Sequence, residues 1–514
     1  MDASRILGYA LTLGAIGMVI LGISDPEVVD QFNVYWMAAA CAFVPGILLA
    51  VGKIAAATAV SRIVVGAIFM VSGLIKANDT VGFGIKLEEY FDENALGAFW
   101  ANFHDFALPI SMFVSGIEVL LGLALVFGAR ARLVAFTLLG MTLFFGWLTW
   151  FTAGCNDAQM VAMTAGTPFE RTCVTDCGCF GDALRGSVGR SLTPWESFYK
   201  DLGLFFMVLV IVIRNRHISV NSLREDAFIL PLTLLIILGF GGWLFGWMFP
   251  TWFFLVSVLV YFLIKSLRLK MVKYEWVLAA SLALLTYGFT FYTYRHLPIK
   301  DFRPYAAGEN IRNQMKGADE LGLEPTIYAT LYKLENAQTG EVMSMNSKEY
   351  LEKEIWKDEN WKITYSSSEP IVIQRGYEAP IASFNILDND GFDIGEELLS
   401  DQNYSFMVVM YDVPKAQTGP VLESLKALSA NAEAAGHHFY VLTASPYEEY
   451  EAFRHDNQIA FPFYTGDEIM LKTIIRANPG LVLLQNGNVI KKWHGNDIPD
   501  FESVQKEYLN KAIN

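Results

Sequence analysis

Residues 106–128 read FALPISMFVSGIEVLLGLALVFG, a run of apolar and small residues in which Glu118 is the one ionisable side chain. A helix of about 20 such residues crosses the hydrocarbon core of a bilayer and satisfies its own backbone hydrogen bonds there. This stretch therefore predicts a membrane-spanning helix, and it sets the class of protein to which the chain is expected to belong.

Eight further stretches have the same character, so the sequence predicts about nine spanning helices. The predicted spans are residues 6–23, 35–52, 61–77, 106–128, 132–153, 200–213, 228–247, 250–267 and 276–294. The chain of 514 residues is 53% hydrophobic and 18% charged, which excludes a disordered or collagen-like protein. The expected fold class is a multi-span α-helical membrane protein with a water-soluble tail.

Lysine and arginine residues fall in alternate loops between these spans. Because basic residues in short loops stay on the cytoplasmic side, the loops at 53–62, 130–132, 214–224 and 265–273 are predicted to be cytoplasmic, together with the N-terminus. The loop at 154–197 and the chain after residue 298 are then expected outside. No signal-peptide cleavage site follows the first span. In a bacterium, this predicts an inner-membrane protein with a periplasmic C-terminal region.

The region after the last span has a different composition. Residues 301–514 hold 18 Lys and Arg against 33 Asp and Glu, which accounts for the whole net charge of −15. This balance, without a basic cluster, argues against nucleic-acid binding. Residues 298–375 predict a small β-rich module. In 376–514, strand-like and helix-like runs alternate and end in a hairpin at Asn486-Gly487, which predicts an α/β domain.

Four of the five cysteines, Cys155, Cys173, Cys177 and Cys179, fall in the one long loop that is predicted to be exterior. An oxidising compartment favours disulfides, with three possible connectivities. A permanently stapled loop and a redox pair that passes electrons into the membrane both stay open. A zinc site is the weakest alternative because the spacing is irregular, so no metal is predicted.

Several polar and aromatic residues lie within or at the ends of the predicted spans. Glu118 sits near the middle of its span, where a carboxylate is costly and faces a bundle interior or a polar ligand. A proton-accepting role beside a quinone and a structural hydrogen bond are both open for it. Lys76 and Asp201 lie near exterior helix ends and could pair, unless Lys76 reaches the interface alone. Trp147 and Trp150 predict an interfacial belt or, less simply, a wall for a quinone ring.

Cys177-Gly-Cys-Phe-Gly-Asp182 resembles the signature of the MauE and DoxX-like membrane family. Residues 61–76 (SRIVVGAIFMVSGLIK) are similar to the first helix of that family, and residues 116–122 (GIEVLLG) and Lys200-Asp201 fit the same pattern. The resemblance covers about 61–216, which it implies to be a four-helix unit.

The resemblance also implies disulfide chemistry beside a thioredoxin-like partner. A cofactor such as a quinone would then lie near a set of charged and aromatic residues: Arg62, Lys76, Trp147, Trp150 and Asp201. Two spans in residues 1–60 precede this unit, and three in 217–297 follow it.

Gly376-Tyr-Glu-Ala-Pro380 and Asn389-Asp-Gly391 resemble the opening of thioredoxin-like proteins of the redoxin type. Residues 475–487 (IRANPGLVLLQNG) resemble the segment that carries the cis-proline of that family, which implies that Pro479 is cis. With Asn478 it would hold an extended client peptide; a scaffold without ligand is the alternative. The Cys-x-x-Cys of the family is missing, because residues 411–417 read YDVPKAQ. Since exchange needs a thiolate, this domain is expected to be redox-inactive.

These features predict an inner-membrane protein of thiol–disulfide maturation. A client thiolate would attack Cys177 or Cys179, with Cys155 or Cys173 as internal relay, and electrons would leave to a membrane quinone near Glu118. The tail would bind a periplasmic client or partner protein, and lipid would surround the spans. The rival hypothesis is a non-enzymatic assembly factor or complex subunit with a stapled loop and a binding domain.

Overall fold

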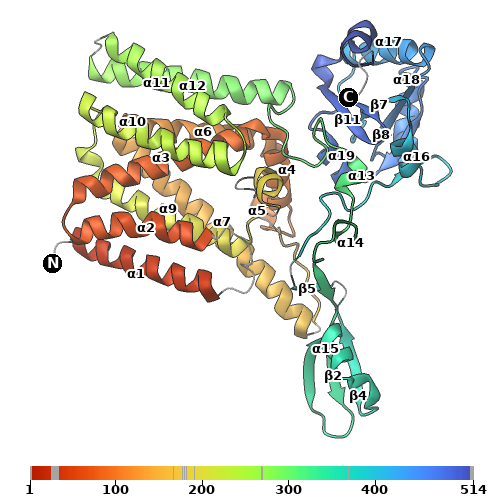
Figure 1. Ribbon diagram of the computed structural model, residues 1–514, viewed down its shortest axis with the longest axis horizontal. Helices are drawn as coiled ribbons and strands as arrows, with labels where there is room; N and C mark the ends of the chain where they lie inside the picture. Colours follow the sequence, from red (N-terminus) through yellow and green to blue (C-terminus); the bar gives the residue numbers. More distant parts are fainter. Residues whose placement is uncertain are drawn as a thin grey trace. The chain divides into compact units, whose positions relative to one another are not determined.

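The computed structural model divides into two compact units, Met1–Thr290 with Ile327–Arg375 and Phe291–Thr326 with Gly376–Asn514. It describes residues 3–24, 34–165, 167–175, 178, 180, 182–189, 191–267, 270–367, 370–374 and 376–509. The first unit is a helical bundle with a small β-rich module, and the second is an α/β domain (Figure 1).

Helices form the bundle. They are α1 (Ala3–Ser24), α2 (Val34–Ala50), α3 (Ile54–Asn78), α4 (Thr80–Tyr90), α5 (Ala98–Ala101), η1 (His104–Phe106), α6 (Ala107–Phe127), α7 (Ala131–Ala165), α8 (Asp182–Val188), α9 (Pro194–Arg214), η2 (Asn215–His217), α10 (Leu223–Ile237), η3 (Leu238–Leu244), α11 (Phe249–Ser266) and α12 (Met271–Arg295). Each of the nine predicted spans overlaps one of these helices.

Within the described part of the chain, six helical segments are long and apolar enough to cross a membrane. They are Ile54–Asn78, His104–Phe127, Ala131–Met163, Leu223–Leu244, Phe249–Ser266 and Lys273–Arg295. Shorter apolar stretches lie in α1 and α2. Helix α9 begins with charged residues, Glu196, Lys200 and Asp201, and therefore has a shorter uninterrupted apolar run.

Glycines let α3 and α6 approach closely. A Cβ atom added at Gly122 would lie 2.6 Å from the carbonyl oxygen of Gly66, and one at Gly73 would lie 2.9 Å from that of Ser115. Small residues at such contacts are typical of membrane helix pairs, because they allow backbones to pack directly. The contact brings Lys76, about one turn after Gly73, beside the middle of α6.

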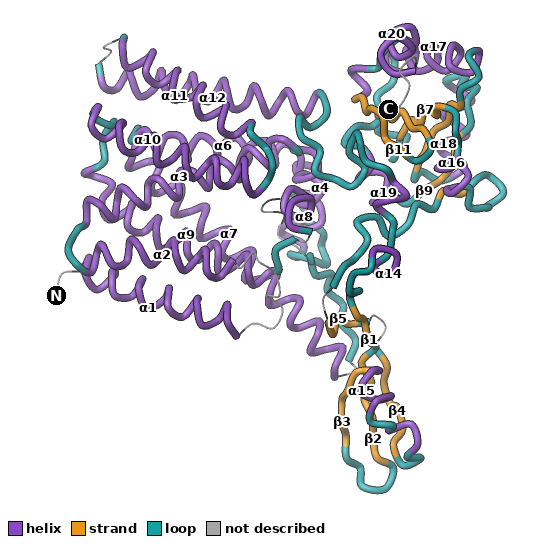
Figure 2. Tube along the Cα trace, viewed as in Figure 1, coloured by secondary structure: helices purple, strands orange, loops and turns teal. Residues whose placement is uncertain are grey.

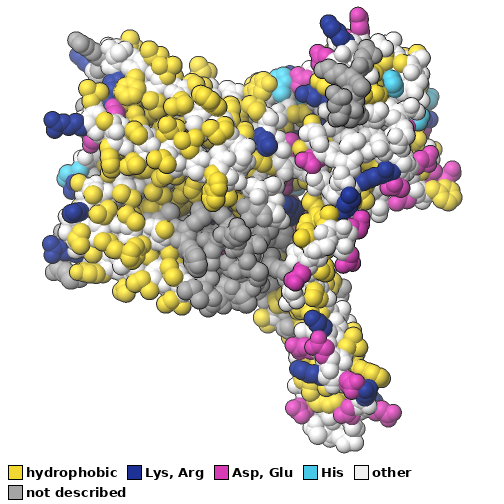
Figure 3. Space-filling view, in the orientation of Figure 1, with side chains coloured by type: hydrophobic (Ala, Val, Ile, Leu, Met, Phe, Trp, Pro, Cys, Tyr) yellow, Lys and Arg dark blue, Asp and Glu magenta, His cyan; other side chains and the backbone are white. Residues whose placement is uncertain are grey.

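The long helices run in alternate directions, so the loops at α2–α3, α6–α7, α9–α10 and α11–α12 gather at one end of the bundle (Figure 1). Lys and Arg side chains collect at this end, while hydrophobic side chains cover much of the visible side of the bundle (Figure 3). The same four loops are the basic ones predicted from the sequence. This distribution suits a bundle whose apolar sides face lipid.

The longest helix, α7, has 35 residues and is about 52 Å long at 1.5 Å per residue. This exceeds the roughly 30 Å of a hydrocarbon core. The backbone oxygen of Ala165 at its end accepts a hydrogen bond from Lys333 Nζ at 3.0 Å. Lys333 lies on β2 of the small β-rich module, so the end of α7 supports this module.

The small module contains two antiparallel sheets, ordered β3-β2-β4 and β1-β5. Its elements are β1 (Ile327–Ala329), β2 (Leu331–Asn336), β3 (Val342–Asn346), α15 (Ser347–Glu352), η4 (Ile355–Lys357), β4 (Trp361–Ser366) and β5 (Ile371–Gln374). The β-rich segment was expected from 298, but its first strand begins at Ile327, and residues 298–326 belong to the second unit.

A six-stranded mixed sheet, ordered β11-β10-β7-β8-β9-β6, forms the centre of the α/β domain (Figure 2). The strands are β6 (Ile386–Leu387), β7 (Tyr404–Val409), β8 (His438–Thr443), β9 (Phe463–Gly466), β10 (Gly480–Gln485) and β11 (Asn488–His494), of which β7, β8 and β9 run parallel. The helical segments are α13 (Ile311–Gln314), α14 (Ala318–Leu321), α16 (Gly395–Ser400), α17 (Pro420–Ala434), α18 (Tyr447–Asp456), α19 (Glu468–Ile474), η5 (Gly495–Asp497), α20 (Phe501–Val504) and η6 (Gln505–Leu509).

Both faces of this sheet are buried. Successive side chains of a strand point to opposite faces, so each strand contributes to both cores. Phe406 and Val408 of β7 join the core that includes α17, α18 and α20. Met407 and Val409 join the opposite core, which includes α16 and α19. A strand covered on both sides is mostly apolar, which is why residues 406–410 read FMVVM.

The hairpin predicted at Asn486-Gly487 is confirmed. The two turn residues have φ of 48° and 75°, as a two-residue turn between antiparallel strands requires. The N–H of Ile311 donates to the Gly487 carbonyl at 2.8 Å, which ties residues 308–311 to this hairpin. The predicted cis-proline is also confirmed, since the Asn478–Pro479 peptide bond is cis.

A buried histidine ends β11. The Nδ1 atom of His494 accepts a hydrogen bond from the backbone N–H of Asn496 at 3.1 Å. Burial, with a smaller contribution from nearby His296, lowers the pKa of His494 to about 4 despite Asp497. The neutral imidazole is therefore the form that the fold accommodates.

Candidate functional site

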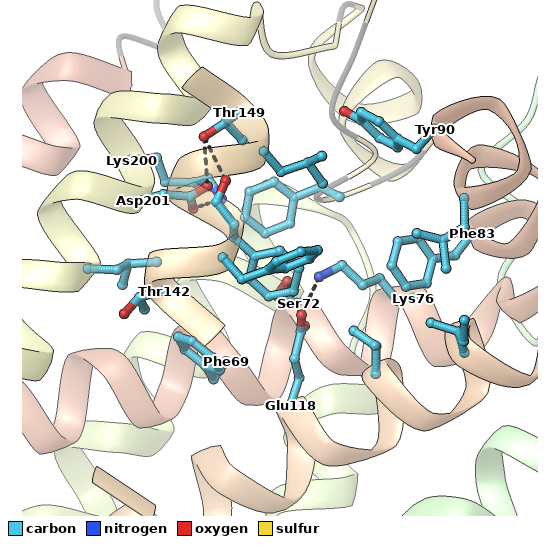
Figure 4. A pocket seen from close by; sticks show the side chains of 18 of the residues that line it. Phe69, Ser72, Lys76, Phe83, Tyr90, Glu118, Thr142, Thr149, Lys200 and Asp201 are labelled. Carbon is cyan, nitrogen blue, oxygen red and sulfur yellow. Dashed lines mark hydrogen bonds and ion pairs between the residues drawn. The ribbon is translucent and has the colours of Figure 1, made fainter. Parts of the chain in front are cut away.

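A cavity of about 220 Å³ lies inside the helical bundle (Figure 4). It lies among α3, α4, α6, α7, α9 and the segment 91–103, and it is lined by Ile68, Phe69, Ser72, Lys76, Phe83, Leu87, Tyr90, Phe91, Leu96, Trp100, Phe103, Ile110, Val114, Glu118, Thr142, Phe144, Phe145, Leu148, Thr149, Phe180, Lys200, Asp201 and Leu204. Pockets for drug-sized ligands are larger, roughly 300–1,000 Å³. The cavity therefore suits a single substituted ring.

An ion pair between α3 and α6 forms part of the cavity wall. Lys76 Nζ lies 2.6 Å from Glu118 Oε1, and the two side chains are 7% and 3% exposed (Figure 4). Ser72 Oγ donates to Glu118 Oε2 at 3.3 Å. The ammonium also lies 5.4 Å and 5.1 Å from the ring centroids of Phe83 and Phe145. A ligand in the cavity would meet an ammonium donor and a carboxylate acceptor side by side.

A second ion pair lines the same cavity. Lys200 Nζ lies 2.7 Å from Asp201 Oδ1, and Thr149 Oγ1 donates to Asp201 Oδ2 at 3.4 Å. The Lys200 ammonium lies 5.4 Å from the centroid of the Phe180 ring. Lys76 and Asp201 thus line one cavity, but each is paired with another residue, because Lys76 faces α6 at the close α3–α6 contact.

One face of α7 connects the cavity to a disulfide bond. Leu148 lines the cavity, and Thr152 and Cys155 follow at helical spacing. Cys155, about 10 Å along the axis from Leu148, is disulfide-bonded to Cys173, with Cα atoms 5.7 Å apart. The hydroxyl of Tyr90, another lining residue, lies 3.2 Å from Thr152 Oγ1. The structure thus selects one pairing among the loop cysteines and attaches it to a helix of the cavity wall.

The other two loop cysteines, Cys177 and Cys179, lie outside the described residues. Their described neighbour Phe180 lines the cavity, and its ring centroid is 5.6 Å from that of Phe245. A Cβ atom added at Gly178, which has a φ of 60°, would lie 2.8 Å from Lys86 Cγ. Phe180, the residue after Cys179 in the sequence, is therefore part of the cavity wall.

Arg62 does not line the cavity, contrary to its expected cofactor-binding role. Its guanidinium donates to the backbone oxygens of Leu125 and Val126 at 3.1 Å and 3.2 Å, and to Asn221 Oδ1 at 2.7 Å. The last carbonyls of a helix have no partner within it, and Arg62 satisfies two of those at the end of α6. Its role in the structure is to cap this helix.

Trp147 and Trp150 are also absent from the cavity lining. They are 38% and 53% exposed on α7, in keeping with an interfacial belt. Trp147 stacks at 5.9 Å on Trp100, which does line the cavity. The aromatic side chains that line the cavity include Phe83, Tyr90, Phe91, Trp100 and Phe103.

The segment around Pro479 is covered by the chain itself. Pro479 is buried, and the carbonyl oxygen of Asn478 accepts from the Gln417 N–H at 3.0 Å. The side-chain amide of Asn478 donates to the Asp412 carbonyl at 2.6 Å. A client peptide at this position would have to displace residues 412–417.

Searches of protein families, curated proteins and solved structures find no match to this chain. Among the described residues, no group of three or more His, Cys, Asp or Glu side chains is arranged to hold a metal ion. What defines the site is therefore its own geometry: an aromatic cavity with two lysine–carboxylate pairs, in a bundle that carries a disulfide.

The sequence reasoning did not identify Tyr90, Trp100 or the other aromatic residues of this wall. They lie between two predicted spans, in a stretch without a clear helical period. The available signal was composition, since residues 83–106 contain seven aromatic side chains: Phe83, Tyr90, Phe91, Phe99, Trp100, Phe103 and Phe106.

Proposed function

We propose that the chain is a membrane thiol–disulfide oxidoreductase whose cavity binds the ring of a quinone. The observation that carries the proposal is the aromatic cavity with its two lysine–carboxylate pairs, which shares α7 with the Cys155–Cys173 disulfide. An aromatic wall stacks on a planar ring, and Lys76 can donate to a quinone carbonyl.

The proposed reaction has two balanced steps. A client dithiol exchanges with a loop disulfide, so the client becomes oxidised and two loop thiols form. Those thiols then give two electrons and two protons to the quinone, which leaves as quinol while the loop disulfide is restored. Cys177 and Cys179 are assigned the client-facing step, and the Cys155–Cys173 pair on α7 is assigned the internal relay toward the quinone. Glu118 and Asp201 are the groups that would hold the protons.

The α/β domain has the proposed role of binding a client or partner. Its parallel β7-β8-β9 core, the antiparallel β10-β11 hairpin and the cis Asn478–Pro479 bond support a thioredoxin-like assignment. The domain contains no cysteine and contributes no redox group. The DoxX/MauE-like assignment of the bundle and the periplasmic location of the loop and domain are parts of the same proposal.

Thiol trapping in nanodiscs tests this function. The full-length chain is reduced, a tailed benzoquinone with every ring position substituted, which cannot add a thiol, is supplied, and free thiols are counted by the gel shift of a maleimide-polyethylene glycol. We expect the quinone to remove two thiols per reoxidised loop pair, and Lys76→Met to slow that loss. The matched control is Lys265→Met, because Lys265 forms a 2.6 Å pair with Asp226 but does not line the cavity.

A non-enzymatic assembly factor is the second candidate, and the burial of Cys155 favours it. This sulfur-bearing residue is 8% exposed, as suits a permanent staple. Loop cysteines that stay oxidised in reductant under all non-denaturing conditions would establish the staple and remove the oxidoreductase proposal.

A further inference from the structure

The two ends of the cavity differ in exposure. Its polar end is buried, with Glu118 and Asp201 only 2% and 4% exposed. Its aromatic end includes Phe103 and Phe144, which are 37% and 40% exposed although they line the same cavity. The cavity wall therefore continues from the interior of the bundle to its outer surface between η1 and α7.

The surface around this aromatic end is apolar. Phe99, Phe106 and Leu143 are 69%, 59% and 53% exposed on the adjoining segments. An exposed histidine and aspartate, His104 and Asp105, interrupt them on η1. Aromatic residues beside a short polar turn are typical of the boundary between hydrocarbon and headgroups.

Depth along α7 puts Phe144 on the hydrocarbon side of this boundary. Phe144 lies 13 residues after Ala131, which is about 20 Å along the helix axis. A hydrocarbon core is about 30 Å thick, so Phe144 lies inside it if α7 starts at the opposite interface. The opening between Phe103 and Phe144 would then face lipid tails.

We propose that the cavity takes its ligand sideways from the lipid, and that this ligand is a quinone with a long apolar tail. This inference rests on the proposed function and adds its substrate class. The cavity, at about 220 Å³, has room for a ring and not for a long chain, so the tail must lie outside. The opening between Phe103 and Phe144 lets it lie in hydrocarbon.

Trp100 lies at this opening. Its ring centroid lies 6.0 Å from those of both Phe103 and Phe144, so it bridges the two sides. It also stacks on Phe91 with ring centroids 6.1 Å apart. A tailed ring that enters here must pass beside Trp100, whereas a polar ligand would have to leave water and cross an apolar surface.

Two photoaffinity probes test the route on the full-length chain in nanodiscs. One is a short azido-benzoquinone that labels from its ring, and the other a benzoquinone with a decyl tail that ends in a diazirine. Mass spectrometry of the labelled peptides gives the positions. We expect ring labels near Ser72 and Glu118, and tail labels within residues 91–106 and 136–151.

The outcomes separate the two proposals. Ring labels at the cavity with tail labels on other helices would overturn the lateral route and leave the proposed function standing. Ring labels elsewhere would overturn both. As a second check, Phe144→Trp should narrow the opening and slow labelling by both the tail probe and the ring probe severalfold. Phe113→Trp, at a 61% exposed position of α6 outside the lining, is the matched control and should change neither.

Discussion

Replacing Lys76 with methionine tests the energetic role of the ion pair at the cavity. The substitution keeps the length and apolar stem of the side chain but removes the ammonium 2.6 Å from Glu118 Oε1. The Glu118 carboxylate, on a side chain that is 3% exposed, then keeps the Ser72 hydroxyl at 3.3 Å as its remaining described hydrogen-bond donor. In the variant, the negative charge of Glu118 would thus stay buried without its counter-ion.

The size of the effect follows from this geometry. Two unit charges 2.6 Å apart attract by about 6 kcal/mol at an effective dielectric constant of about 20. Desolvation offsets much of this attraction, but removal of one partner of a buried pair still costs about 3–5 kcal/mol. We expect Lys76→Met to destabilise the bundle by that amount. The double variant Lys76→Met/Glu118→Met should recover most of the loss, because replacing both charges is often neutral.

Chemical unfolding in mixed micelles, followed by far-ultraviolet circular dichroism, measures these differences. Lys86→Met is the control, because the Lys86–Glu89 pair is also 2.6 Å long but its side chains are 19% and 47% exposed. An exposed pair contributes about 1 kcal/mol or less. If the double variant is as unstable as the two single variants added together, the residues are not coupled and the reasoning from burial is refuted.

Three further predictions concern other parts of the chain. Cys173→Ser should lower the free energy of unfolding by about 3 kcal/mol in the same assay, because the bond closes a loop with a sequence separation of 18; no loss would show that the bond is absent. Gly122→Ala should destabilise the bundle through the α3–α6 contact, while Gly140→Ala, where added atoms meet open space, should not. Stability of the α/β domain should fall by up to about 3 kcal/mol as pH drops from 6.5 to 4, because the unfolded chain protonates His494 before the folded one does. Urea unfolding across this range should lose that dependence in His494→Gln, and an unchanged pH profile would contradict the assignment.

Local patterns accounted for the elements that the sequence predicted well. Each apolar run became a helix, and Asn486-Gly487 became the hairpin turn, because these outcomes depend on neighbouring residues. The partner of Glu118 was not predictable in this way. It depends on a close backbone approach at Gly73, which brings together helices whose contacting residues are far apart in the sequence.

The second unit gives a similar contrast. Its strands and its main helix were predictable from strand-like and helix-like stretches that follow one another in the sequence. The attachment of residues 308–311 to the β10–β11 hairpin depends instead on long-range hydrogen bonds, such as that from the Ile311 N–H to the Gly487 carbonyl. The contacts of Arg62 with the end of α6 were not predictable for the same reason. A lone arginine in a span indicates a polar partner, but not whether that partner is a ligand or the exposed end of another helix.

The unbroken length of α7 makes the orientation of the β-rich module sensitive to insertions. Cys155 and Ala165 lie on one continuous helix. A residue added between them would rotate the C-terminal end of α7 by about 100° about the helix axis and move it 1.5 Å along that axis. An insertion of two residues would point the β-rich module away from its present side. Natural variation in this part of the chain should therefore favour lengths near whole helical turns.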